Sequence, residues 1–141
     1  MFLFLLLSGC SKPGKNGGNP RGAAPEHSIH YLEIVTTDVE AACQHYTKAY
    51  GWQFKPAGPE LGNSFTAEIP GGSLCGIRGP LNSEETPIVR AYLRVADIQK
   101  ATQEAERLGA TLLLDTMDIP GWGKISIYEF GGIQQGLWQV P

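Results

Sequence analysis

The sequence predicts an α+β fold built from two βαβββ modules. Residues 89–110 read as an alternating strand that leads directly into an amphipathic helix, with Asp97 at the position of the helix N-cap. Residues 30–52 repeat this order of elements, with Asp38 in the capping position. Three short strand-like runs, divided by Gly and Pro turns, follow each unit. We therefore interpret the chain as two copies of one module.

The first module is expected to begin with a strand over residues 28–35. Alternation places Leu32 and Ile34 toward the helix, and Tyr31, Glu33 and Val35 on the opposite face. The helix should pack through an apolar stripe of Val39, Ala42, Cys43, Tyr46, Ala49 and Tyr50 and end at Gly51. Further strands are expected over residues 52–56, 63–69 and 73–79, and residues 79–87 should link the modules.

The second module begins with the strand before Asp97. Its apolar face carries Ala91, Leu93 and Val95, and its polar face carries Arg90, Tyr92 and Arg94. The helix should bury Ile98, Ala101, Ala105 and Leu108 and end at Gly109. Strands are expected over residues 111–117, 124–130 and 134–140, with a loop over residues 119–123.

The charge balance argues against nucleic acid as a partner. All 14 acidic residues lie at or beyond Glu26, and residues 27–141 carry 8 Lys and Arg against 13 Asp and Glu. Proteins that bind nucleic acid normally present a basic patch or stripe. We expect no such partner.

The N-terminus looks like an export signal. Residues 1–10, MFLFLLLSGC, form an apolar run too short to span a bilayer, and LSGC resembles a bacterial lipobox. This resemblance implies that Cys10 is lipidated and that the protein is exported and membrane-anchored. Residues 11–26 contain no large apolar side chain, as is typical of a flexible tether. The alternative is an apolar tail on a cytoplasmic protein.

The folded part, residues 27–141 with modules 27–79 and 87–141, resembles the vicinal oxygen chelate superfamily, which includes glyoxalase I and bleomycin-resistance proteins. The stretch TDVEAACQHYTKAYGW resembles the superfamily's opening helix, and LGATLLLDTMDIPGWGKISIYEFGGIQQGLW resembles its closing stretch. The nearest branch consists of small proteins related to lactoylglutathione lyase. The resemblance implies a curled mixed sheet of eight strands around a pocket, with one helix per module outside. Activity does not follow from it, because one fold hosts many reactions.

Superfamily enzymes hold a divalent metal at four pocket-facing positions, which correspond here to Tyr31, Gly76, Arg90 and Gly136. Arginine stays cationic and glycine has no side chain, so these positions cannot form the usual site for a hard cation. We expect neither a metal nor another cofactor.

The pocket implied by the resemblance should be lined by Tyr31, Glu33, Arg78, Arg90, Tyr92, Arg94 and Trp138, with Trp122 either over its mouth or plugging the edge of the core. Arg90 and Glu33 form either a structural ion pair or part of a site for an anion flanked by aromatic rings. No Ser, Cys or His is placed as an activated nucleophile, so catalytic residues stay unassigned.

Two functions therefore remain open. The first is a metal-independent protein of the cell envelope that binds an anionic or aromatic small molecule. The second is a glyoxalase-type lyase or isomerase with a divalent metal not located here. A homodimer is left as an open alternative. Cys43 and Cys75 should share one helix–sheet interface, as two separate thiols or, less favoured, as a disulfide.

Overall fold

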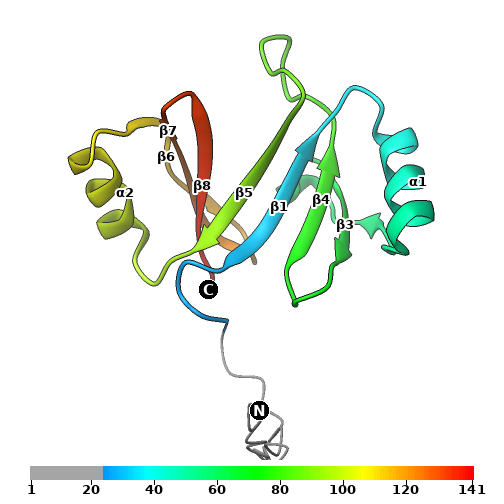
Figure 1. Cartoon of the computed structure of the whole chain (residues 1–141), viewed down its shortest axis with the longest axis horizontal. Helices are drawn as coiled ribbons and strands as arrows, with labels where there is room; N and C mark the ends of the chain where they lie inside the picture. The colour runs from blue at the N-terminus through cyan, green and yellow to red at the C-terminus, as the bar shows by residue number, and fades with distance from the viewer. Residues whose placement is uncertain (1–23) are drawn as a thin grey trace, which may run out of the picture.

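The computed structural model describes residues 24–141, so the signal-like segment, Cys10 and most of the predicted tether lie outside the described residues. Two helices and a single eight-stranded sheet form the structure (Figure 1). The first half contains β1 (Ile29–Val35), α1 (Val39–Tyr50), β2 (Lys55–Pro56), the short 3₁₀ turn η1 (Pro59–Leu61), β3 (Phe65–Glu68) and β4 (Leu74–Arg78). The second half contains β5 (Ile88–Arg94), α2 (Ile98–Arg107), β6 (Thr111–Ile119), β7 (Gly123–Phe130) and β8 (Ile133–Gln139).

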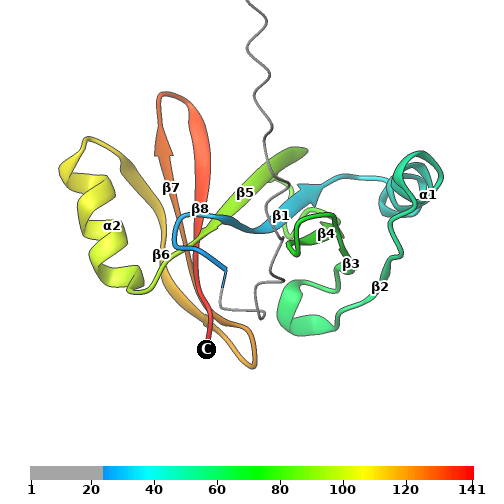
Figure 2. The same cartoon turned by 60° about the horizontal axis from the view of Figure 1, so that its bottom comes forward.

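The sheet has the strand order β2-β3-β4-β1-β5-β8-β7-β6, so each half contributes four adjacent strands. The halves meet at the antiparallel pair of β1 and β5, and each of these strands also pairs in parallel with the last strand of its own half. The η1 turn and the β6–β7 hairpin project to the same side of these central strands (Figure 2). The predicted fold class is confirmed.

Both helices begin at the predicted aspartates. The Asp38 carboxylate accepts a hydrogen bond from the Ala41 N–H at 3.0 Å, and the Asp97 carboxylate accepts one from the Lys100 N–H at 3.1 Å. Each bond satisfies one of the N–H groups that a first helical turn leaves without a partner. The caps fix where the chain turns from strand into helix in each half.

The helices cover the face of the sheet on which Leu32, Ile34 and Leu93 lie. Val39, Ala42, Cys43 and Tyr46 pack on β1 and β4 as expected, but Tyr50 is 61% exposed. Its ring lies instead 5.4 Å from that of Trp52, centroid to centroid, after α1 has ended. Ile98 and Ala101 of α2 are packed, whereas Leu108 at the helix end is 62% exposed beside Phe130. The prediction that the apolar residues in the last turn of each helix are buried is therefore wrong.

Residues 52–61 also differ from the prediction. The ring of Trp52 stacks on that of Tyr46 of α1, with 5.4 Å between the centroids and an interplanar angle of 8°. Trp52 is therefore not part of the sheet, and within the predicted strand only Lys55–Pro56 pair with a neighbour. The chain then makes the η1 turn, which the sequence analysis did not predict. This turn places Leu61 over the face of the sheet opposite the helices.

Cys43 and Cys75 lie in the same apolar cluster between α1 and the sheet, and both are free thiols. Cys75 is fully buried, while Cys43 is partly exposed. Burial raises the pKa of the Cys75 thiol to about 11. The favoured prediction of two separate thiols agrees with this geometry.

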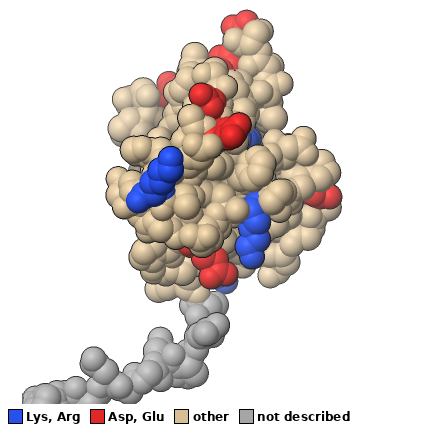
Figure 3. Space-filling model, turned by 90° about the vertical axis from the view of Figure 1, so that its right-hand side faces the viewer, with Lys and Arg blue, Asp and Glu red and all other residues tan. Residues whose placement is uncertain are grey.

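The described surface shows no concentration of basic side chains on the side of α1. Lys and Arg lie singly there among acidic and uncharged residues (Figure 3). Among the residues that the structure describes, no helix is long and apolar enough to cross a membrane.

Candidate functional site

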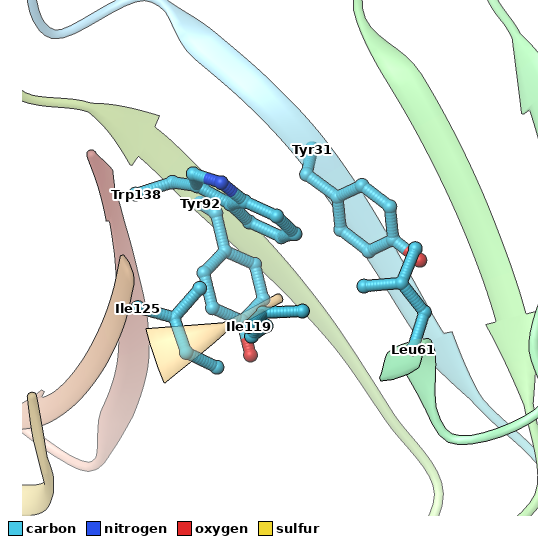
Figure 4. Close-up of a cluster of buried hydrophobic side chains, with 6 residues drawn as sticks. All are labelled: Tyr31, Leu61, Tyr92, Ile119, Ile125 and Trp138. Atoms are coloured by element: carbon cyan, nitrogen blue, oxygen red, sulfur yellow. The ribbon is translucent and has the colours of Figure 1, made fainter. Parts of the chain in front are cut away.

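A pocket of about 270 Å³ lies on the face of the sheet opposite the helices, where the two halves meet. Three aromatic rings form one end of it (Figure 4). Tyr31 comes from β1, Tyr92 from β5 and Trp138 from β8, and their ring centroids lie 5.0 to 6.0 Å apart. The Trp138 indole N–H donates to the Trp122 carbonyl at 2.8 Å, which fixes the orientation of the indole ring.

The remaining wall is mostly apolar. It is formed by Leu61, Leu81, Leu114, Met117, Ile119, Ile125 and Ile127. Leu61 on one side and Ile119 with Ile125 on the other face the aromatic rings across the pocket (Figure 4). Such a lining favours a ligand with an apolar body.

Glu33 is the polar centre of the site. One carboxylate oxygen accepts from Arg78 Nε at 2.8 Å, and the other accepts from Arg90 Nη1 and from the Tyr92 hydroxyl, the latter at 3.1 Å. The side chains of all three charged residues are less than 10% exposed. The ion pair of Arg90 and Glu33, one of the two alternatives left open by the sequence, is therefore present, and Arg78 extends it.

Arg78 is also held from its other side by Glu85, a residue of the segment that links the halves. Arg78 Nη1 and Nη2 donate to the two Glu85 oxygens at 2.8 and 2.7 Å, in a fork geometry. The Leu81 backbone N–H donates to Glu85 at 2.8 Å as well. Arg78 lowers the pKa of the Glu85 carboxyl to about 2, mainly through these hydrogen bonds.

Burial dominates the ionisation of the two tyrosines. It raises the pKa of Tyr31 to about 12 and also raises that of Tyr92, where the nearby Glu33 carboxylate adds to the shift. Both phenols are therefore neutral at physiological pH. They can donate a hydrogen bond but cannot serve as phenolate ligands.

The four positions at which the superfamily binds a metal do not fit a metal here. A β-carbon on Gly76 would lie 1.6 Å from the Tyr31 hydroxyl oxygen, and one on Gly136 would lie 2.3 Å from the Tyr92 ring. The tyrosine rings thus occupy the space that ligand side chains would need. Arg90, at the remaining position, is bound to Glu33 and Gln134. Among the described residues, no group of three or more His, Cys, Asp or Glu side chains could hold an ion.

Six of the eight predicted pocket residues line this pocket: Tyr31, Glu33, Arg78, Arg90, Tyr92 and Trp138. The other two do not. Arg94, at the end of β5, lines a surface hollow beside Glu26, because Trp138 already fills the pocket face at this end of the sheet. Trp122 packs against the outside of the aromatic cluster, close to Ala57 and Leu74, so it plugs the core edge rather than covering the mouth.

Sequence reasoning missed Glu85, Gln134 and the apolar wall. Alternation in β7 gave a signal for the wall, since Ile125 and Ile127 are two residues apart on one face. Glu85 gave none, because it lies in a segment that reads as an exposed linker. Gln134 accepts from Arg90 Nη2 at 2.6 Å, a contact between residues 44 positions apart.

Comparison with solved structures identifies the fold. A methylmalonyl-CoA epimerase from Mycobacterium tuberculosis matches with a TM-score of 0.66 and 14% identity, over 85% of this chain and 92% of that one. The hypothetical protein BH1468 from Bacillus halodurans matches with the same TM-score and identity, over 81% of this chain and 94% of that one. The chain has the vicinal oxygen chelate fold. A Streptomyces coelicolor methylmalonyl-CoA epimerase in complex with 2-nitronate-propionyl-CoA shares this fold at a TM-score of 0.61 and 14% identity, over 82% of this chain and 99% of that one.

Among curated proteins, this chain is similar to "Putative glyoxylase CFP32" of Mycobacterium bovis and of Mycobacterium tuberculosis. Each match is 27% identical over 117 residues and covers 79% of this chain. The chain spans 45% of the length of these relatives. No family model matches the chain.

Proposed function

We propose that this protein binds a small organic molecule in the pocket between its two halves, without a metal ion. The observation that carries the proposal is the lining of the pocket: three aromatic rings and an apolar wall surround a buried polar group whose charges are already paired. Pockets that bind small molecules commonly combine a mostly apolar lining with a few placed polar groups. The S. coelicolor epimerase, which has the same fold, is complexed with 2-nitronate-propionyl-CoA.

The alternative, a glyoxalase-type lyase or isomerase, is favoured by the name of the curated relatives alone. Acid–base chemistry in the pocket would have to use Glu33. Both of its oxygens already accept hydrogen bonds, from Arg78, Arg90 and Tyr92. A general base needs a free acceptor site directed at the substrate proton. This arrangement supports binding rather than proton transfer.

A bulky substitution at the pocket wall tests the binding function. Met117 lines the pocket and is 44% exposed, so Met117→Trp should narrow the pocket without disturbing the core. Leu113→Trp is the matched control, because Leu113 lies on the same strand with 49% exposure and does not line the pocket. With 2-naphthamide as the probe in calorimetric titration, we expect binding to the wild type and to Leu113→Trp, and at least about tenfold weaker binding to Met117→Trp. Equal affinities in all three proteins would reject the pocket as the binding site.

Metal independence has a separate test. The purified protein is treated with EDTA, dialysed and then titrated with Ni²⁺, Zn²⁺ and Mn²⁺. Because Tyr31, Gly76, Arg90 and Gly136 cannot assemble a cage, the melting temperature and the affinity for 2-naphthamide should not change. A melting temperature that falls with EDTA and recovers with one equivalent of a divalent ion would favour the lyase alternative.

We propose in addition that the protein acts at the cell envelope. The support for this part comes from the sequence alone, from the LSGC segment that ends at Cys10 and from the polar composition of residues 11–26. Every residue that lines the pocket lies between Tyr31 and Trp138, so anchoring through Cys10 would leave the pocket unaltered.

A further inference from the structure

Every guanidinium nitrogen of the two pocket arginines already donates to a protein acceptor. All three nitrogens of Arg78 donate, to Glu33, Glu85 and the Gly79 carbonyl, at 2.7 to 3.1 Å. All three nitrogens of Arg90 donate as well, to Glu33 and to Gln134. An anionic ligand would therefore compete with a protein carboxylate, amide or carbonyl at every guanidinium nitrogen.

The charges that line the pocket also disfavour an anion. Arg78 and Arg90 contribute two positive charges, and Glu33, Glu60 and Glu85 contribute three negative ones. The Glu85 carboxyl stays ionised well below neutral pH, because the hydrogen bonds from Arg78 lower its pKa. A carboxylate entering an apolar pocket of this net charge would lose its hydration without gaining a cation to pair with.

Glu85 occupies the place that a ligand carboxylate would take. Its two oxygens meet the Arg78 guanidinium in the fork geometry that arginine offers to any carboxylate. It comes from the segment between β4 and β5, and Leu81 of the same segment lies over Gly62 of the η1 turn, 3.3 Å from where a β-carbon would sit. The linking segment thus forms part of the pocket wall and brings its own carboxylate to Arg78.

We propose that Glu85 is a specificity-determining residue that restricts the pocket to uncharged ligands with an apolar, ring-sized body. This inference rests on the proposed binding function and names the ligand class for the same pocket. The Tyr31 and Tyr92 phenols, together with the Trp138 ring, would hold the apolar body. A carbonyl or amide oxygen on the ligand could accept from the Tyr31 hydroxyl without disturbing the paired charges, whereas the Tyr92 hydroxyl already donates to Glu33.

Three probes of nearly the same shape separate the ligand classes: 2-naphthamide, 2-naphthoate and 2-(aminomethyl)naphthalene, which are neutral, anionic and cationic at pH 7. Each is titrated calorimetrically into the wild type, Glu85→Gln and Glu84→Gln. Glu84→Gln is the matched control, since Glu84 precedes Glu85, is exposed and makes no contact with Arg78. Melting temperatures of all three proteins verify that each is folded, and Glu85→Ala serves as a second variant if Glu85→Gln does not fold.

In the wild type and in Glu84→Gln, we expect the amide to bind at least about tenfold more tightly than the carboxylate and the amine, a difference of about 1.4 kcal/mol. In Glu85→Gln the ratio between amide and carboxylate should fall by about tenfold or more, because Arg78 is then free to pair with the ligand. The inference is overturned if the wild type prefers the carboxylate or the amine, or if Glu85→Gln leaves the ratio unchanged; in these cases the binding function stands. If no probe binds the wild type, both the inference and the binding function fail.

Discussion

Glu33 is the residue on which the polar part of the pocket depends. It lies on β1 between Arg78 on β4 and Arg90 on β5, and it pairs with both. The two buried guanidinium groups on the strands that flank β1 would otherwise repel each other in a region of low dielectric constant. The single carboxylate therefore ties the first half of the molecule to the second.

Glu33→Gln should destabilise the protein strongly, because it leaves the buried Arg90 without a counter-ion and leaves Arg78 with Glu85 alone. Breaking a buried ion pair by removing one partner costs about 3–5 kcal/mol. Urea unfolding followed by tryptophan fluorescence measures the loss. Glu104→Gln is the control, since its pair with Arg107 lies on the surface of α2 and should contribute far less. Equal losses in the two variants would mean that the buried network does not stabilise the fold.

Glu85 should make stability depend on pH at the acid end. Its pKa is about 2 in the folded protein, against an ordinary value of 4.5, so the folded state favours the ionised form. The contribution of Glu85 is complete above about pH 4.5 and is lost as the pH falls toward 2. The difference in unfolding free energy between the wild type and Glu85→Gln should therefore shrink over this range. A difference that stays constant from pH 5 to pH 2 would show that Arg78 does not perturb the carboxyl.

At the scale of elements, strands and helices that follow a regular period could be predicted and the connections could not. Asp38 and Asp97 mark both helix starts because a cap is a local interaction between residues three positions apart. The η1 turn and the pairing of Glu85 with Arg78 depend on how separate segments meet in space, which no local pattern encodes. Arg94 illustrates the same limit. Alternation places it on the same face of β5 as Tyr92, but the neighbouring Trp138 excludes it from the pocket.

Gly136, inside β8 and paired with Tyr92 of β5, has a testable packing role. Gly136→Ala places a methyl group 2.3 Å from the Tyr92 ring, which is 3% exposed and lies 5.5 Å from Trp138 between ring centroids. Because the buried ring would have to shift from its packed position against Trp138, we expect a loss of about 1–3 kcal/mol in unfolding free energy. Gly79→Ala is the control, since its added methyl group would meet only an oxygen at 4.0 Å.

A double variant separates this clash from a general effect of alanine. Adding Tyr92→Leu to Gly136→Ala removes the ring that the methyl group meets, so the two losses should not add. Strict additivity of the two changes would mean that the Tyr92 ring does not fill the space above Gly136.

At the scale of the whole molecule, the pocket is a joint product of the two halves. Tyr31 and Glu33 come from the first half and Tyr92 and Trp138 from the second, and the central pair of β1 and β5 brings them together. Alternation along β1 and β5 was enough to predict that Tyr31, Glu33, Arg90 and Tyr92 share the face opposite the helices. The balance of charges that line the pocket could not be predicted from the sequence, since it depends on Glu85 from the linking segment.

The whole chain should be attached to a membrane through Cys10. The full-length protein is produced in a bacterial host with labelled palmitate, together with Cys10→Ala and with Cys43→Ala as the control for loss of a thiol elsewhere. We expect label and membrane association for the wild type and Cys43→Ala, and neither for Cys10→Ala, because the lipid attaches at the cysteine of LSGC. Cys10→Ala should still bind 2-naphthamide with wild-type affinity, since the pocket residues lie far along the chain from the anchor. Equal labelling of Cys10→Ala, or an unlabelled wild type, would overturn the anchoring proposal and leave the binding function to stand by itself.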